Sequence, residues 1–297
     1  MIAILGGLSA AFLWATANLA SSRSSRLIGA SSTVAWMMLV GLAVTAPIAL
    51  VSEPMPPMTP ALAVWLTASG AGGVVGLLFL YRGLRIGKVG VVLALASTEG
   101  AIAALFSVIG GESLNVATAL VLGLIAIGIA TVALAGGSAA EGTEAVEADG
   151  STPPSAAPGA ERRSVLFGAA AAIAFAFSIY GTARIGLSLP LVLAVMPARV
   201  AGVACVFVPL ALTGRLRMTR RAAPLVVIVG IFEVLGNAAF ILGSHESIAI
   251  ASVLASQYAA VAAVAAFFLF RERLSRGQRS GFVAIAVGLA ILTAVRG

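Results

Sequence analysis

The amino-acid sequence predicts an all-α integral membrane protein with ten transmembrane helices, arranged as two inverted repeats of five helices each. Three observations support this prediction. The composition is strongly apolar, the apolar residues fall into segments long enough to cross a bilayer, and related residue groups recur in the two halves of the chain. Together they place most of the chain inside a bilayer.

Composition excludes an ordinary soluble domain. Of the 297 residues, 60% are hydrophobic and only 10% are charged, with a mean hydropathy of +1.09. Soluble domains carry about a quarter charged residues, so a soluble protein of this composition could not cover its own surface. Lipid is therefore the expected solvent. The single cysteine, Cys205, lies in an apolar stretch and is interpreted as a small buried hydrophobic residue.

Ten apolar segments approach the roughly 20 residues that a membrane-spanning helix needs. They cover residues 2–20, 31–51, 60–81, 89–110, 114–135, 164–181, 188–212, 222–243, 247–270 and 279–295. The prolines of segment 51–60 predict a loop. Residues 138–163 are rich in Gly, Ser, Pro and acidic residues and predict an acidic flexible linker. This linker separates a first five-helix repeat, residues 1–137, from a second, residues 164–297.

Related residue groups recur at corresponding positions of these two halves. The matched segments are 95–97 with 254–256, 111–114 with 271–274, and 125–130 with 285–290. Ordered matches of this kind indicate a duplication. Because each half holds an odd number of spans, the second half enters the membrane from the opposite side, and the halves are inverted repeats. Inverted halves with a central site are a recurring transporter design.

Basic residues predict the orientation. The loops after odd-numbered spans hold Arg23, Arg26, Arg82, Arg85, Lys88, Arg162, Arg163, Arg215, Arg217, Arg220, Arg221, Arg271, Arg273, Arg276 and Arg279. The other side holds only Arg184 and Arg296. The positive-inside rule then places these loops and the linker in the cytoplasm and both termini outside, in a plasma or inner membrane. The net charge of +7 is thus a topology signal, and no nucleic-acid partner is expected.

Three ionisable residues, Glu99, Arg199 and Glu233, fall near the middle of predicted spans. A charge at that depth costs roughly 2.5–3.5 kcal/mol, so each requires an explanation. Two explanations are open: the residues line a cavity that binds cargo, or they form an ion pair that holds helices together. The same choice applies to uncharged polar residues at membrane depth, for which hydrogen bonding between helices is the alternative. These are Asn18, Asn237, Gln257 and Tyr258.

Other features are given structural explanations. The small-residue run 70–76 predicts close helix packing and lacks the Lys-Ser/Thr ending of a phosphate-binding loop. Glu112 and Glu272 lie at span ends, where capping or a surface role is expected. Prolines in the seventh span predict local kinks. They are Pro190, Pro197 and Pro209.

Several motifs add to the five-plus-five arrangement. They are Leu13-Trp14-Ala15, Thr98-Glu99-Gly100, Gly111-Glu112-Ser113-Leu114, Arg271-Glu272-Arg273-Leu274, and the glycines Gly128 and Gly288. With this arrangement, nearly the whole chain outside the linker resembles the EamA-type ten-helix members of the drug/metabolite transporter superfamily. Two places depart from the family pattern. Gly100 stands where a proline is frequent, and Ser256-Gln257-Tyr258 replaces a glutamate–proline pair.

The resemblance implies ten helices around a central cavity and a secondary transporter of small metabolites, such as amino acids or drugs, that acts frequently as an exporter and uses no cofactor. We expect the cavity to hold Trp14, Asn18, Glu99, Arg199, Glu233, Asn237, Gln257 and Tyr258. Glu99 is also the candidate for proton coupling, because a carboxyl group buried away from cations can bind and release a proton. The expected partners are a small-molecule cargo, the lipid bilayer and protons, with the oligomeric state open.

Two other classes of function were weighed against a carrier: a membrane channel or scaffold, and an intramembrane enzyme. The sequence lacks a His-Glu-x-x-His pair and a Gly-x-Ser-x-Gly elbow, so only Glu99 with Glu233 could serve an enzyme. No metal site and no nucleotide-binding motif is present in the sequence, which argues against direct ATP drive. We therefore expect a transporter and not an enzyme.

Overall fold

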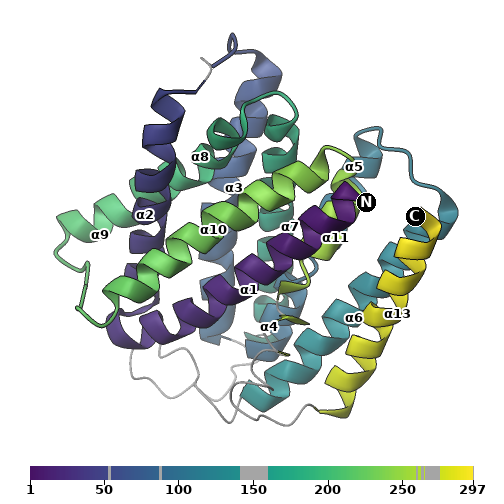
Figure 1. Cartoon of the computed structure of the whole chain (residues 1–297). Helices are drawn as coiled ribbons and strands as arrows, with labels where there is room; N and C mark the ends of the chain where they lie inside the picture. The colour runs from purple at the N-terminus through teal and green to yellow at the C-terminus, as the bar shows by residue number, and fades with distance from the viewer. Residues whose placement is uncertain are drawn as a thin grey trace.

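In the computed structural model, residues 1–52, 55–86, 89–140, 160–258, 260, 261, 264 and 275–296 are described, and all regular elements among them are helices. Eight of these helices are long and apolar enough to cross a membrane. Figure 1 shows them packed as one bundle. The predicted all-α membrane class is therefore confirmed.

The first half of the chain contains α1 (Ile2–Ile28), α2 (Ala30–Leu50), α3 (Pro60–Ile86), α4 (Val89–Ala96), α5 (Glu99–Ile109) and α6 (Val116–Ala140). The second half contains α7 (Ala160–Gly186), α8 (Leu191–Gly202), the π-helical turn η1 (Val203–Phe207), α9 (Val208–Leu212), α10 (Ala223–Ser244), α11 (Ile248–Ala255) and α13 (Arg276–Arg296). Residues 141–159 of the predicted linker lie outside the described residues.

The fourth predicted span, residues 89–110, is two helices and not one. The hydroxyl of Thr98 donates to the Leu95 carbonyl at 2.7 Å, and the Thr98 amide donates to the same carbonyl at 3.1 Å. These local bonds compete with the α-helical pattern and end α4 before Ser97. The ninth predicted span begins with α11, and most of its remainder lies outside the described residues.

The seventh predicted span departs from α-helical geometry near its second half, where prolines predicted kinks. Pro209 has no N–H to donate to the carbonyl of Cys205, and the Val208 amide bonds to the Val203 carbonyl with π spacing. None of the residues of η1 is buried, and Cys205 is exposed. The expected burial of Cys205 is therefore wrong, because in a membrane protein an apolar residue can face lipid instead of a core.

Small residues bring the principal helix pairs together. The most extensive packing joins α3 to α7, α1 to α10, and α6 to α13. A Cβ on Gly72 would lie 2.8 Å from the Ala174 carbonyl oxygen, and one on Gly6 would lie 2.5 Å from the Cα of Gly243. The predicted packing role of the run 70–76 is confirmed at Gly72, since only glycine permits this approach of α3 to α7.

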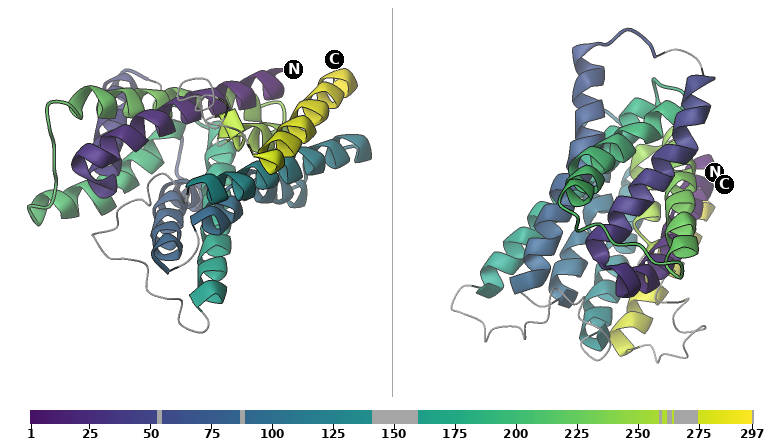
Figure 2. Two further views of the ribbon diagram at one scale, coloured as in Figure 1. Left: turned by 90° about the horizontal axis from the view of Figure 1, so that it is seen from below. Right: turned by 90° about the vertical axis from the view of Figure 1, so that its left-hand side faces the viewer.

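The pair α6 and α13 lies side by side at one edge of the bundle, as both Figure 1 and the left view of Figure 2 show. The two ends of the chain lie near each other in all of these views. The remaining long helices surround the middle of the molecule, where the core contains Trp14, Tyr180 and Phe240. The candidate site lies beside this core.

Candidate functional site

A cavity of about 660 Å³ lies in the middle of the bundle, and helices from both halves of the chain form its walls. Seven of the eight residues expected at a central cavity line it: Trp14, Asn18, Glu99, Arg199, Glu233, Asn237 and Tyr258. The eighth, Gln257, is buried but is not among the lining residues. The sequence-predicted residues therefore come together in space, although they lie on five different segments of the chain.

Glu99 and Tyr258 meet where two broken helices cross. Glu99 is the first residue of α5 and is buried, and Tyr258 follows the break at the end of α11. Their side chains are hydrogen-bonded to each other. Glu99 also lies at a helix N-terminus, where the free backbone N–H groups favour negative charge.

Gly100 makes this crossing possible. A Cβ on Gly100 would lie 2.4 Å from both the Ser252 carbonyl oxygen and the Ser256 hydroxyl oxygen. Real Cβ atoms do not approach oxygen atoms so closely, so the start of α5 reaches α11 only with glycine at this position. The departure from the family pattern at residue 100 thus has a steric cause, since a proline ring would collide with α11.

The two helix breaks fall on one of the sequence matches between the halves. In the matched segments 95–97 and 254–256, α4 ends at Ala96 and α11 ends at Ala255. Glu99 and Tyr258 each lie two residues beyond the matched serine. The two residues that meet in the cavity therefore occupy corresponding positions in the two halves.

Arg199 and Glu233 form a loose ion pair on the cavity wall. Arg199 is only 2% exposed, and its Nη2 lies 3.3 Å from the Glu233 carbonyl oxygen and 3.5 Å from Oε2 of the same residue. Asn237 donates to the Glu233 carbonyl at 2.7 Å. Charge-assisted N–H···O bonds are normally about 2.7–2.9 Å long and often bidentate between Arg and a carboxylate. Both explanations offered for these residues therefore apply: Arg199 and Glu233 line the cavity and also form an ion pair. The hydrogen bonds of this pair are longer than usual.

Aromatic side chains form another part of the wall. The ring of Trp14 lies 6.1 Å from that of Phe240 and 6.3 Å from that of Tyr258, the latter edge-on. Gly236 makes room for Trp14, because a Cβ there would lie 2.5 Å from the indole Nε1. These three rings, inclined to one another, offer an apolar surface beside the charged groups.

Sequence reasoning missed several lining residues, among them Phe240, Ser178 and Thr182. Asn237 and Phe240 follow Glu233 at helical positions i+4 and i+7, so all three share one face of α10. That spacing could have identified Phe240. Ser178 and Thr182 are likewise four residues apart on α7, and Thr182 also hydrogen-bonds to Ser69 of α3 at 2.7 Å.

A second, shallower hollow of about 830 Å³ lies between α2, α3 and α8. Its lining contains no ionisable side chain. Gly70 lines both this hollow and the central cavity, and a Cβ there would lie 3.0 Å from the Pro197 carbonyl oxygen. Of these two hollows, only the central cavity has ionisable side chains among its described lining residues.

Fold and cavity together define a multi-pass helical membrane protein with a polar, aromatic-lined cavity shared by both halves. Residues 1–134 match the EamA-like transporter family, which belongs to the drug/metabolite transporter superfamily. The family resemblance noted in the sequence is thus confirmed over residues 1–134. Together with the apolar helices, this match supports a transporter of this superfamily in general terms. EamA is a family of transporters and not of enzymes.

Two further comparisons complete this result. No curated protein matches the chain. One solved structure, titled only as the crystal structure of a protein, is similar with a TM-score of 0.74 over 99% of this chain and 97% of that chain. The two sequences are 19% identical, so this similarity concerns the fold alone.

Proposed function

We propose that the protein is a secondary transporter that exports small metabolites, such as amino acids or drugs, by exposing the central cavity to each side of the membrane in turn. One observation carries this proposal. Charged, amide and aromatic side chains from both halves line a single cavity beside two broken helices. Ionisable groups at membrane depth and interrupted helices are typical of transport sites.

The pattern of helix contacts supports an arrangement of ten helices in two inverted repeats. In chain order, α1, α2, α3 and α4 of the first half correspond to α7, α8, α10 and α11 of the second. If corresponding helices are exchanged, the contact of α3 with α7 becomes that of α10 with α1. The contact of α2 with α10 becomes that of α8 with α3, and the contact of α4 with α7 becomes that of α11 with α1. All six contacts are present, as a pseudo-two-fold axis requires. Rocking of one repeat against the other would then expose the cavity alternately.

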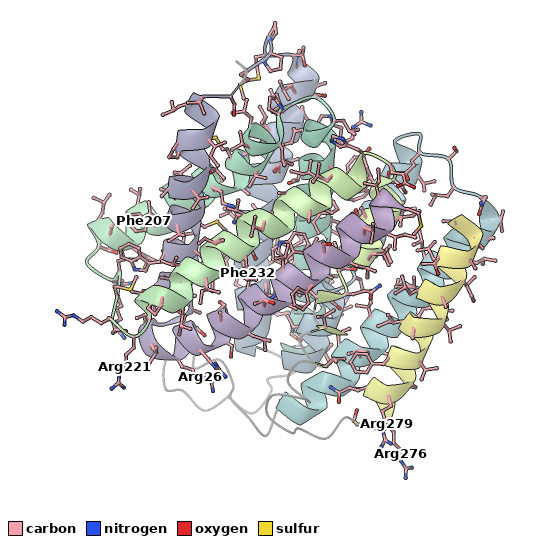
Figure 3. All side chains as sticks on the ribbon, in the orientation of Figure 1. Arg26, Phe207, Arg221, Phe232, Arg276 and Arg279 are labelled. Atoms are coloured by element: carbon pink, nitrogen blue, oxygen red, sulfur yellow. The ribbon has the colours of Figure 1, made fainter. Side chains whose placement is uncertain are left out.

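The distribution of arginines supports termini outside and a cytoplasmic linker. Figure 3 shows the labelled Arg26, Arg221, Arg276 and Arg279 along the lower edge of the bundle, away from the two chain ends marked in Figure 1. With the positive-inside rule, this edge is the cytoplasmic one. Reporter fusions test the orientation: a C-terminal alkaline phosphatase should be active and a C-terminal fluorescent protein dark, and the reverse pattern would overturn it.

The position of Glu99 supports its role in proton coupling. Glu99 lines the cavity and is hydrogen-bonded to Tyr258, whereas the cavity's arginine, Arg199, contacts Glu233. Glu99 therefore has no cation among its described hydrogen-bond partners. A carboxyl group in this setting can change its protonation without first breaking an ion pair.

Counterflow is the test of this function. Metabolite profiling of the growth medium from overexpressing and deletion strains first identifies the released compound, which is then loaded into liposomes that contain the purified full chain. A carrier accumulates external label by exchange against the internal compound. Ion conductance without exchange would indicate a channel, and chemical conversion of the compound would indicate an enzyme. Either result would contradict the proposal.

A further inference from the structure

Two fully buried hydrogen-bond donors of described cavity-lining residues lack a partner. Within the described part of the chain, Nε of Arg199 and the indole Nε1 of Trp14 are buried and have no hydrogen-bond partner. Both residues line the cavity. A buried donor without a partner costs roughly 1–3 kcal/mol, so such groups in a native structure require an explanation.

The guanidinium group of Arg199 is poorly satisfied as a whole. It carries five N–H donors, and its described contacts are the two long ones to Glu233 and one of 3.5 Å to the sulfur of Met38. If this pair served only to hold helices together, we would expect two short, bidentate hydrogen bonds between Arg199 and Glu233. Only such bonds offset the free-energy cost of removing a buried arginine from water.

The position of Arg199 is nevertheless well defined. A Cβ on Gly41 would lie 2.9 Å from Cδ of Arg199, so glycine at that position leaves room for the arginine stem against α2. The stem is thus held by packing, and Arg199 is part of the cavity wall. This is the geometry of a preformed anion-binding group.

The two carboxylates of the cavity have hydrogen-bond donors beside them. The Glu233 carboxylate lies within 3.5 Å of both Arg199 and Asn237, and Glu99 is hydrogen-bonded to Tyr258. An ammonium group on the cargo would compete with these donors. An anionic group would instead meet the guanidinium group of Arg199, whose described contacts are all 3.3 Å or longer.

We propose that the cargo is an organic anion whose carboxylate, or chemically equivalent anionic group, binds the guanidinium group of Arg199. The apolar body of the cargo lies against the rings of Trp14 and Phe240. This inference rests on the proposed function, because it takes the central cavity as the cargo site. In this assignment, the N–H groups of Arg199 that lack close partners bind the cargo. The contact of Arg199 with Glu233 belongs to the cargo-free state.

Ligand binding to the purified full chain in detergent tests this assignment with matched probes. Each set shares one apolar body (phenyl, indole or isobutyl) and differs in its head group: 3-phenylpropionate, phenylalanine, phenethylamine and the phenyl phosphonate and sulfonate, with the corresponding indole and isobutyl compounds. Thermal stabilisation and fluorescence of Trp14, measured with Trp36 and Trp65 replaced by Phe, report binding. We expect stabilisation by anionic members of at least one set and none by the amines.

Arg199→Gln should weaken binding of the anionic probes at least tenfold, whereas Arg184→Gln, the same change at an arginine that lies over the Trp65 ring outside the cavity, should leave binding unchanged. If Arg199→Gln does not fold, Arg199→Lys serves instead, since it keeps the charge and loses the planar fork. Comparison of carboxylate with phosphonate and sulfonate identifies the preferred anion.

Three outcomes would overturn the inference: amines that bind as well as carboxylates, no stabilisation by any anionic probe, or anion binding that is the same in the Arg199 variants as in the parent. These outcomes are separable from failure of the proposed function. Counterflow of a cationic cargo would retain the transporter and reject the anion, whereas anion binding without any exchange would retain the site and reject transport.

Discussion

Glu99 and Tyr258 face each other across the crossing of two broken helices, one from each half of the chain, and their side chains are hydrogen-bonded. They occupy corresponding positions, two residues beyond the matched Ser97 and Ser256. At this position the first half of the chain provides a carboxyl group and the second half a phenol. A site built from both halves is sensitive to changes in either.

Replacement of Glu99 should affect proton-coupled transport but not the exchange of cargo across the membrane. Glu99→Gln preserves the shape of the cavity and removes the titratable group, so counterflow should stay within about twofold of the parent while accumulation driven by a pH gradient is lost. Tyr258→Phe keeps the carboxyl group and should retain the driven accumulation. Uptake into proteoliposomes with and without a pH gradient measures both. Normal gradient-driven uptake by Glu99→Gln would show that Glu99 is not an essential proton carrier.

Gly100→Ala should destabilise the protein. The added methyl group would collide with backbone and side-chain oxygens of α11, and overpacking of this kind typically costs about 1–3 kcal/mol. Gly123→Ala is the matched control, since a Cβ on this α6 glycine meets nothing within 4 Å. It should be neutral or stabilising by up to about 1 kcal/mol. Thermal unfolding in detergent compares the two, and equal melting temperatures would contradict the crossing described here.

Removal of one partner from the Arg199–Glu233 pair should cost more than removal of both. Glu233→Gln leaves a buried guanidinium without its counter-charge, and we expect a loss of roughly 1–3 kcal/mol in unfolding free energy. The double change Arg199→Met with Glu233→Leu should recover most of this stability, because well-packed apolar residues can replace a buried pair.

Transport assays test whether the Arg199–Glu233 pair binds cargo or only holds helices together. The double variant should fold and fail in counterflow, since it lacks the group assigned to the cargo. Arg184→Gln should keep both stability and exchange to within about a factor of two. A stable double variant with full activity would limit the role of Arg199 and Glu233 to packing.

Glu112 ties the end of α5 to the start of α11. Its carboxylate accepts hydrogen bonds from the hydroxyls of Ser107 and Ser247 and, at 3.2 Å, from the Ala249 amide. The capping role predicted for Glu112 is thus confirmed, whereas Glu272 lies outside the described residues. Glu112→Ala should lower stability by about 1–2 kcal/mol. Ser107→Ala should cost less, because it leaves the Ser247 and Ala249 contacts of Glu112 in place, and a larger loss for Ser107→Ala would contradict this ranking.

Much of this architecture could be predicted from the sequence because a bilayer imposes strong local rules. Long apolar segments must be helices in lipid, and this identified the long spans and the loop at residues 51–60. Expensive polar residues at depth must gather together, and this identified Arg199 and Glu233 although they lie on different helices.

Other features depend on contacts between distant segments. The helix break at Ser97 and Thr98 accompanies the crossing of α5 with α11, which no local pattern shows. The exposure of Cys205 depends on which side of η1 faces lipid. The meeting of Glu99 with Tyr258 required knowledge of how the two halves pack.

Cysteine accessibility tests the central claim, a single cavity exposed to either side in turn, most directly. With Cys205 replaced by Ser, Ser178→Cys places the only thiol in the cavity wall, and Ile241→Cys provides a fully buried control outside it. A membrane-impermeant maleimide is applied to right-side-out and to inside-out vesicles. We predict that the thiol at position 178 is labelled from each face in membranes that do not conduct ions, while the control is not labelled. Labelling of position 178 from one face only would contradict alternating access.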